Sequence, residues 1–485
     1  MPVQRFPFFV ARRGFSLALG AIFFCAFASL GVQIRGLFGA HGISPAVEYL
    51  RAAREQLGGS AWLAVPTFCW FDAGDGFLVG MCVAGCVISA VLVAGYAPGA
   101  CSLALWALYL SLCSVGSPFL NFQWDALLLE AALLAVFYLP WKWRPDWSHE
   151  SRVSRLARWL LWWLLFRLML ASGVVKLSSG DEAWCSLSAL HFHFETQPLP
   201  LWTAWYVHQF PHWLLCAMEA IMFAIELGAP FLIVAPRRWR HGGAAALIAL
   251  QLGILATGNY AFFNHLAIAL CVLLIDDGAW PRRGRERFPA NENAPASAKW
   301  PLRIFAPVAA VIVIVTTMPF LDAFRTGWRW PEPFAGLRNA LAPLQSFNGY
   351  GLFAVMTTTR PEIFVEGSDD GVNWQAYRFR WKPGNVRERP ALVAPHQPRL
   401  DWHMWFAALS DYQHEPWFIR FLVRLLEGSP DVLGLLEWNP FPAHPPRYIR
   451  AVIYEYHFTH WGDSAWWTRG EKQLYCPAFS LRKEE

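Results

Sequence analysis

The chain has 485 residues, of which 55% are hydrophobic and only 15% are charged, with a formal net charge of +5. Soluble domains usually carry about 25% charged residues, so this composition excludes an ordinary soluble protein and favours a membrane protein. The 28 Trp residues agree, because indole rings are favoured at the membrane–water interface. The basic residues lie in short clusters beside apolar runs, and we predict no nucleic-acid partner.

In chain order, the first two thirds of the sequence are a series of apolar runs. A helix needs about 20 apolar residues to cross a bilayer. Counted this way, about nine spans are predicted, at 15–34, 77–95, 100–118, 126–140, 157–175, 212–235, 242–258, 260–275 and 304–320. The span 126–140 is marginal, and 242–275 is open to a second interpretation as one span with a re-entrant piece. The first run is longer than the apolar part of a signal peptide, so we interpret it as a retained anchor.

Charge asymmetry predicts the orientation, because cytoplasmic loops carry the excess of Lys and Arg. With a cytoplasmic N-terminus, nine spans place the basic clusters of segments 5–13, 142–158, 237–240 and 282–303 on the inside. The outside then holds only Arg35, Arg51, Arg54 and Lys176. We therefore predict that the last third of the chain lies outside the cytoplasm, in the periplasm of a bacterium or the endoplasmic reticulum lumen of a eukaryote.

After Phe320 the pattern changes. Residues 321–349 are interpreted as a linker and residues 350–485 as a compact domain. Strand-like runs flank Asp370-Gly371, which is a hairpin signal, and a further strand is predicted at 448–458. Segments 400–409 and 416–427 are typical of helices. The predicted fold is a polytopic α-helical membrane bundle followed by an α+β extracytoplasmic domain built on a small β-sandwich.

Ionisable side chains inside a bilayer are costly and are therefore candidates for function. Five lie in predicted spans, namely Glu130, Arg167, Glu219, Glu226 and His265. The interpretation we favour is that Arg167 forms a buried ion pair with one of the three glutamates. The alternative is a polar pocket open to the outside, lined by Asn121, Gln123, Asp125, Glu130, Lys176, Glu219, Asn264 and His265.

Lys176 ends an apolar run, and two roles are open for it. Its side chain either extends to the lipid headgroups, which we favour, or is partly desolvated and acts as a catalytic base.

Two further polar groups lie outside the spans. In an outer loop, His191, His193 and Glu195 have the donor types of a metal site, but the spacing supplies no further strong ligand. In the tail, His396, Arg399, Asp401 and His403 form either a site or, as we favour, a network of turn and cap contacts.

The usual motifs of soluble enzymes are missing from the sequence. It contains no nucleotide-binding loop, no G-x-S-x-G, no H-E-x-x-H and no Cys/His zinc pattern. Most of the ten cysteines lie in apolar segments, where Cys behaves as a small hydrophobe. A disulfide between Cys69 and Cys185 stays open, because both lie outside those segments. We predict neither a metal nor a cofactor.

Several long and unusual strings resemble the lipase maturation factor family over nearly the whole chain. They are 121–130 (NFQWDALLLE), 170–177 (LASGVVKL), 193–200 (HFETQPLP), 258–264 (GNYAFFN), 396–402 (HQPRLDW) and 439–442 (NPFP). The resemblance implies a multi-pass protein with a lumenal tail that helps secreted lipases to fold and assemble. The partners implied are the lipid bilayer and a secreted client protein such as a lipase.

A fainter resemblance concerns the surroundings of Lys176. Gly173, Lys176, Leu177 and Trp184 are similar to a stretch in vitamin K-dependent gamma-carboxylases and related transmembrane domains, in which the lysine serves as a base. This similarity implies an alternative function, a membrane-embedded enzyme with an outward-facing pocket. We interpret the chain as a maturation factor rather than an enzyme and keep the alternative open.

Overall fold

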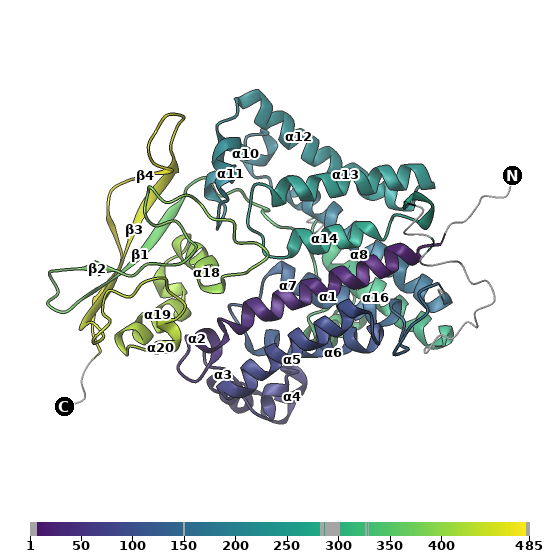
Figure 1. The fold of residues 1–485 in the computed structure, drawn as a ribbon, viewed down its shortest axis with the longest axis horizontal. Coiled ribbons are helices and arrows are strands. Elements are labelled where there is room, and N and C mark those ends of the chain that lie inside the picture. Colours follow the sequence, from purple (N-terminus) through teal and green to yellow (C-terminus); the bar gives the residue numbers. More distant parts are fainter. Residues whose placement is uncertain are drawn as a thin grey trace.

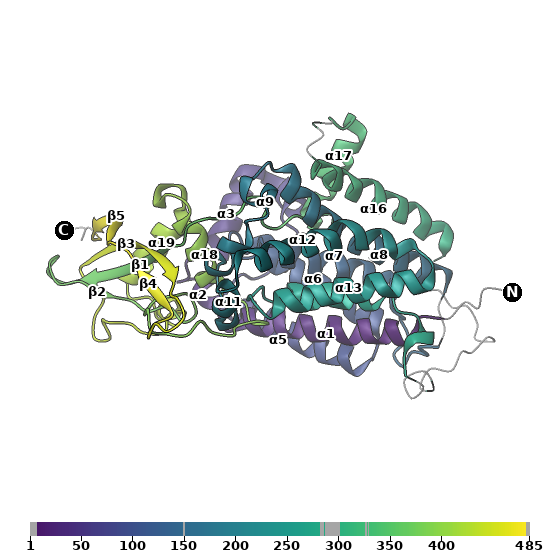
Figure 2. The ribbon, with the colours of Figure 1, turned by 90° about the horizontal axis from the view of Figure 1, so that it is seen from above.

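The computed structural model describes residues 7–148, 151–281, 286, 301–324, 327 and 329–481. Long helices run side by side through most of the molecule, and a small sheet lies at one end of them (Figure 1). The described chain begins at Pro7 at the opposite end of the helices, and the view from above gives the same arrangement (Figure 2).

Six helical segments are long and apolar enough to cross a membrane. They are α1 (Phe9–Gly31), α5 (Asp75–Ala94), α6 (Pro98–Val115), most of α8 (Arg152–Ser178), α12 (His212–Gly228) with the 3-10 turn η3 (Ala229–Val234), and α16 (Leu302–Asp322). Such runs form helices in a bilayer because every backbone N–H and C=O must then be satisfied within the segment. The chain is a multi-pass membrane protein.

The other three predicted spans are also helical but less suited to crossing. They are α7 (Gln123–Tyr138), α13 (Arg237–Leu255) and α14 (Phe263–Val272). Helices α7 and α14 are short, and α13 begins with Arg237, Arg238 and Arg240. Every predicted span thus coincides with a helix, whereas the count of nine crossings stays a prediction.

Contacts between helix ends show that successive long helices alternate in direction. The start of α1 lies at the end of α5, where Arg13 donates to Val93 O at 2.7 Å. It also lies at the end of α14, because Asp277 accepts from Phe9 N at 3.0 Å. The end of α7 contacts the starts of α6 and α16. The end of α14 contacts the first half of α8 and the start of α13. The basic starts of α1, α8 and α13 therefore lie together, at the end away from the sheet (Figure 1).

Short helices connect the long ones. Between α1 and α5 lie α2 (Ile34–Phe38), α3 (Ala46–Leu57) and α4 (Ala61–Ala64), and between α8 and α12 lie α9 (Glu182–Cys185), α10 (Leu190–Thr196) and α11 (Trp202–His208). Helix α17 (Glu332–Leu341) follows α16, inside the segment that the sequence predicted to be a linker. Helices α2 and α11 lie at the end of the bundle that carries the sheet (Figure 2).

The C-terminal domain contains five antiparallel strands. They are β1 (Pro361–Ser368), β2 (Gln375–Ala376), β3 (Tyr448–Phe458), β4 (Trp467–Arg469) and β5 (Gln473–Phe479), in the order β2-β1-β3-β4, with β5 also paired to β3. The predicted turn after β1 is present, and Gly371 has the positive φ of +73° that this turn requires. The α+β class is confirmed. The strands that the structure describes form one sheet, where the sequence predicted a sandwich.

The sheet is covered on both faces. Alternation along β1 and β3 turns Ile363, Val365 and Ala451 to one face, where helices α18 (Arg399–Ala408) and α19 (Pro416–Leu426) pack. The short helix α20 (Pro430–Leu433) packs between α2 and α19. On the other face, Tyr456 joins a cluster with Trp205 of α11. Helices of the bundle thus take the place of a second sheet.

Candidate functional site

A buried polar cluster joins the bundle to the C-terminal domain through Arg399. This side chain, at the start of α18, is 1% exposed and donates to both oxygens of Asp125 in α7, at 2.6 and 2.8 Å. It also donates to Phe119 O at 3.0 Å, and Tyr109 donates to Asp125 at 2.5 Å. Asp125 in turn raises the pKa of Arg399 against the opposing effect of burial. A bidentate pair of this kind combines charge with fixed geometry.

A second cluster is centred on Glu130, one and a half turns further along α7. Glu130 pairs with Arg167 of α8, which was one of the pairings that the sequence left open, and both side chains are 1% exposed. Tyr350 donates its hydroxyl to Glu130 at 2.7 Å, and Arg167 donates to Asn348 O at 2.9 Å. Residues 348–350, from the segment around the predicted domain boundary, therefore complete the pair inside the bundle.

A third cluster surrounds Arg360, which is fully buried just before β1. It donates to Glu195 O and Gln197 O at 2.5 Å each, and to the carboxylate of Glu362 at 2.8 Å. The backbone of the loop between α8 and α12 is thereby bound to the edge of the sheet. Burial lowers the pKa of Arg360, and Glu362 opposes that effect.

The four polar residues predicted as a group in the tail point to four separate partners. His396 bonds Ser29 at 2.8 Å and His403 bonds Pro118 O at 3.0 Å, both in the bundle, while Arg399 binds Asp125. Asp401 instead accepts from Trp381 N and Lys382 N within its own domain, at 2.9 and 3.0 Å. His396, Arg399 and His403 thus form an interdomain contact, Asp401 holds a turn of its own domain, and the four side chains do not converge on one point.

A cavity of about 390 Å³ lies inside the bundle between α8, α12 and α13. Its walls are mostly apolar and include Met169, Met222, Ile225 and Phe263. Leu352 and Phe353, from the tail segment that follows Tyr350, close one side, and Trp184 donates to Phe353 O at 2.9 Å. Ligand pockets usually have volumes of about 300–1,000 Å³.

Polar groups stand on the wall of this cavity. Lys176 Nζ donates to both oxygens of Glu226, at 2.8 and 2.7 Å, and lies 5.3 Å from the centre of the Trp184 ring. The side chain is 6% exposed, so it turns into the bundle and does not extend to the headgroups. Asn264 also lines the cavity and donates to Gln251 at 2.8 Å.

The residues of the predicted outward pocket do not share one space. Asp125 and Glu130 belong to the interdomain clusters, whereas Lys176 and Asn264 line the cavity. The other four do not line the cavity. Gln123 accepts from Gly351 N at 3.2 Å, and Asn121 donates to Ser117 at 3.2 Å. Glu219 accepts from Leu190 N at 3.3 Å, and His265 is half-buried in α14.

The outer loop of His191, His193 and Glu195 is helical, so these side chains face different ways. His193 lies on the cavity wall, and Glu195 accepts from Phe458 N at 2.9 Å. His191 bonds His212 at 2.6 Å, and these two with Cys216 have donor atoms within 4.8 Å of one another. Imidazole and thiolate are metal ligands, but the bond between the two rings already uses the nitrogens that face each other.

The cysteines that the sequence left open as a disulfide are both free. Cys69 is buried beneath the helix ends near α6, whereas Cys185 is exposed at the end of α9.

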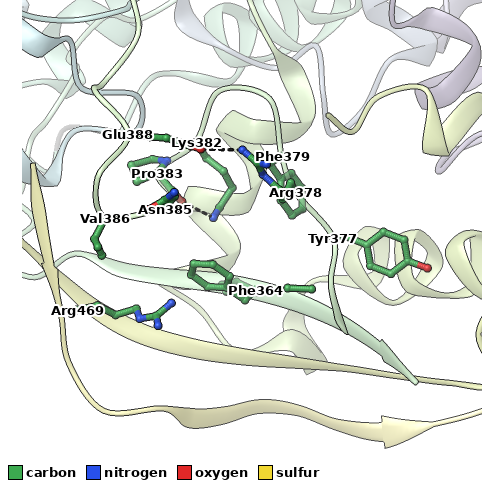
Figure 3. A pocket seen from close by; sticks show the side chains of 13 residues that line it. Phe364, Tyr377, Arg378, Phe379, Lys382, Pro383, Asn385, Val386, Glu388 and Arg469 are labelled. Atoms are coloured by element: carbon green, nitrogen blue, oxygen red, sulfur yellow. Dashed lines mark hydrogen bonds and ion pairs between the residues drawn. The ribbon is translucent and has the colours of Figure 1, made fainter. Parts of the chain in front are cut away.

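A groove of about 380 Å³ opens on the C-terminal domain, over the face of β1 that carries Phe364 (Figure 3). Arg378, Lys382 and Arg469 line it together with the loop 383–388. Arg378 pairs with Glu388 at 2.7 Å, and Lys382 pairs with Glu362 at 2.8 Å. The groove therefore combines the aromatic ring of Phe364 with the buried Lys382 and with the exposed side chains of Arg378 and Arg469.

Sequence reasoning did not single out several residues that these sites use, among them Arg360, Asn348, Tyr350 and Gln251. Asn348 lies at the end of the predicted linker and Tyr350 at the start of the predicted domain, and neither carries a charge, so nothing marked them. Gln251 did carry a signal, because it is the one amide within the apolar run 242–258.

The structure thus defines a multi-pass membrane protein whose last α+β domain is fastened to the helix bundle by buried charges. Residues 10–282 match the model of the lipase maturation factor transmembrane domain, and residues 346–477 match that of the lipase maturation factor C-terminal domain. The chain belongs to the lipase maturation factor family.

Individual relatives give the same assignment. The chain is 35% identical to lipase maturation factor 2 of Xenopus laevis and 33% identical to that of Homo sapiens, in each case over 97% of this chain and 82% of the relative. It is 31% identical to lipase maturation factor 1 of Bos taurus, over 98% of this chain and 89% of the relative. No solved structure matches the chain significantly.

Proposed function

We propose that this protein helps a secreted client protein, such as a lipase, to fold and assemble outside the cytoplasm. Its relatives are named for lipase maturation, and both of its domains match theirs. The observation that carries the proposal is the rigid attachment of the C-terminal domain by the Arg399, Arg360 and Glu130 clusters. A domain held in this way presents one fixed surface beside the membrane, where a client leaving the translocation machinery would meet it.

We propose the orientation of the protein in the membrane from the ends of its helices. The basic starts of α1, α8 and α13 lie together at one end of the bundle, and the positive-inside rule assigns that end to the cytoplasm. The C-terminal domain then faces the periplasm or the endoplasmic reticulum lumen. A reporter that is active only in the cytosol, fused after residue 485, should be inactive. An active fusion would overturn the orientation.

The client-facing surface that we assign is the groove of Figure 3. Exposed basic and aromatic groups are suited to an unfolded polypeptide, since Arg and aromatic side chains are enriched where proteins bind partners. Arg469 lies on the rim with its guanidinium 4.5 Å from the Tyr454 ring. Trp461 lies beyond the sheet, packs against Trp205 at 5.2 Å, and is 66% exposed.

Complementation tests the function. Cells that lack their own maturation factor are given this chain and a secreted lipase, and active lipase in the medium is measured against total lipase protein. The chain should restore the ratio of active to total lipase. A stably expressed chain that leaves this ratio unchanged would overturn the proposed function.

Point variants test the groove within the same assay. Deleting the domain is unsuitable, because residues 348–350 and 399 complete buried charge clusters of the bundle. We expect Arg469→Glu to lower the yield of active lipase about tenfold, the equivalent of roughly 1.4 kcal/mol of binding. Arg447→Glu is the matched control, an exposed arginine of the same domain that does not line the groove. Equal yields from the two variants would exclude the groove while leaving the function itself standing.

A further inference from the structure

The cavity beside Lys176 has a mouth on the membrane-facing side of the bundle. Its lining includes Ile221 of α12, which is 59% exposed, and Ala249 and Gly253 of α13, which are also exposed. Nothing lies within 4 Å of the position that a Cβ on Gly253 would take. Ile221 lies in the middle of α12 and Ala249 more than one turn before the end of α13, whereas Gly253 lies close to that end. A molecule that enters between α12 and α13 beside Ile221 and Ala249 therefore comes from the hydrocarbon region of the bilayer.

The interior of the cavity has unused hydrogen-bonding capacity. An ammonium group has three N–H donors. Lys176 directs two hydrogen bonds to Glu226 and one, at 3.9 Å, to Met222 Sδ, a weak acceptor that a ligand oxygen can replace. Among the amides, pairing of Asn264 with Gln251 leaves Asn264 Oδ1 buried without a partner. An apolar chamber with a weakly bonded donor and an unpaired acceptor has the composition of a ligand pocket.

The polar groups that line the cavity carry no net charge. Lys176 and Glu226 neutralise each other. Burial lowers the pKa of His193 to about 4, with the charge of Lys176 acting in the same direction, so the imidazole is neutral near pH 7. A ligand with a charged head would bring an unbalanced charge into this space, at a cost that an uncharged head avoids.

We propose that the cavity is a binding site for an uncharged single-chain lipid, such as a monoacylglycerol, that enters laterally from the bilayer. The chain lies among the methionine and aromatic side chains of α8, α12 and α14. The head accepts a hydrogen bond from Lys176 through a hydroxyl or ester oxygen. Closure by Leu352 and Phe353 places this site directly beneath the C-terminal domain. The site is independent of the client proposed above.

Photolabelling of the full-length protein in phosphatidylcholine nanodiscs tests the proposal. The probe is a monoacylglycerol with a diazirine in its chain, and adducts are mapped by mass spectrometry. We expect adducts on α12, α13 or the segment 352–353, competed by unlabelled monoacylglycerol. At neutral pH, oleate should compete about tenfold less well, because its carboxylate is charged. Uncompeted labelling, or adducts confined to other helices, would overturn the site.

Two glycine variants separate the cavity from the general lipid-facing surface. Gly253→Phe fills the mouth and should reduce competed labelling about tenfold. Gly80→Phe is the matched control, because Gly80 is an exposed glycine of α5 with open space at its Cβ position and lies away from the cavity. Equal labelling of the two variants would contradict the proposal.

A charge variant tests the preference for a neutral head. Glu226→Gln removes the negative charge and leaves the Lys176 ammonium unbalanced beside the ligand. We expect oleate to become the better competitor in this variant, which is a change in selectivity that loss of structure would not produce. If oleate competes equally well in wild type and variant, the assignment of an uncharged head is wrong.

Discussion

Two groups of buried charges in this protein differ in what surrounds them. Arg399 and Asp125 are enclosed by Phe119 O and the Tyr109 hydroxyl, and neither residue lines the cavity beside Lys176 or the groove on the C-terminal domain. Lys176 and Glu226 instead stand on the wall of a cavity of about 390 Å³. The first pair joins two domains across 274 residues of sequence, and the second joins helices α8 and α12.

This difference separates the roles of the two pairs. A charge pair whose groups are bound by neighbouring side chains and backbone holds structure, because few of its hydrogen-bonding groups remain for a ligand. A charge pair beside free space keeps part of its hydrogen-bonding capacity available. The same contrast predicts how much stability is lost when one side chain of each pair is substituted. Beside a cavity, water or a ligand can take the place of the missing group and bond the remaining charge, so the loss is smaller.

The largest effect is expected for Arg399→Met. This change leaves Asp125 as an unpaired carboxylate in a closed site and separates the domains at the same time. Removing one partner of a buried pair costs about 3–5 kcal/mol of the free energy of unfolding. Thermal unfolding of the purified protein in detergent, followed by tryptophan fluorescence, should show a large fall in the midpoint. Loss of a single monodisperse species in size-exclusion chromatography would agree with it.

Arg378→Met is the matched control for that variant. Arg378 forms ion pairs with Glu388 and Glu437 on the surface of the same domain, and its side chain is 50% exposed. Exposed pairs contribute about 0–1 kcal/mol, so this variant should unfold close to the wild-type temperature. If the thermal midpoint falls by a similar amount in both variants, burial is not the reason for the contribution of the Arg399–Asp125 pair to stability.

A smaller effect is expected for Glu226→Gln. The amide retains one oxygen acceptor for Lys176, and water can enter the cavity to solvate the remaining charge. We expect a loss of about 1–3 kcal/mol, the range for an incompletely satisfied buried group. The same unfolding assay measures it. A loss as large as that of Arg399→Met would contradict the distinction between enclosed and cavity-lining pairs.

Much of the fold could be predicted from the sequence because the bilayer imposes strong rules. Apolar runs of fixed length mark the helices, and each of the predicted spans coincides with one. The strands around Asp370-Gly371 were also predictable, since the turn has a specific composition. The single sheet was not, because helix α11 covers the face that a second sheet would cover, and this helix comes from a loop of the bundle.

The sequence identified many of the residues of these clusters but not which residues bond to each other. Costly charges inside spans stood out, and so did the polar string that contains Arg399. Their pairing depends on contacts such as Arg399 with Asp125 and Arg360 with Gln197, which bring together residues far apart in sequence. Neutral residues such as Tyr350 gave no signal, because a tyrosine at the start of a predicted soluble domain carries no charge and is not expected inside the membrane bundle.

The smallest effect concerns His403, which lies beside the Arg399 cluster and is buried as a neutral ring. Burial lowers its pKa to about 3, and the charge of Arg399 acts in the same direction. In the unfolded chain the His403 imidazole takes up a proton near pH 6.5, whereas in the folded protein it stays neutral at that pH. The free energy of unfolding therefore falls as the pH drops below about 6.5. At about pH 5.5 the loss is roughly 1.4 kcal/mol.

His403→Gln should remove this part of the pH dependence while keeping an N–H donor for Pro118 O. The measurement is the difference in thermal midpoint between about pH 7.5 and about pH 5.5, which should be smaller in the variant than in the wild type. His444→Gln, at an exposed histidine of the same domain, serves as the control and should keep the wild-type difference. Because other histidines titrate alike in all three proteins, their effects cancel in this comparison. If the variant keeps the full wild-type difference, His403 is not held neutral by the interdomain contact.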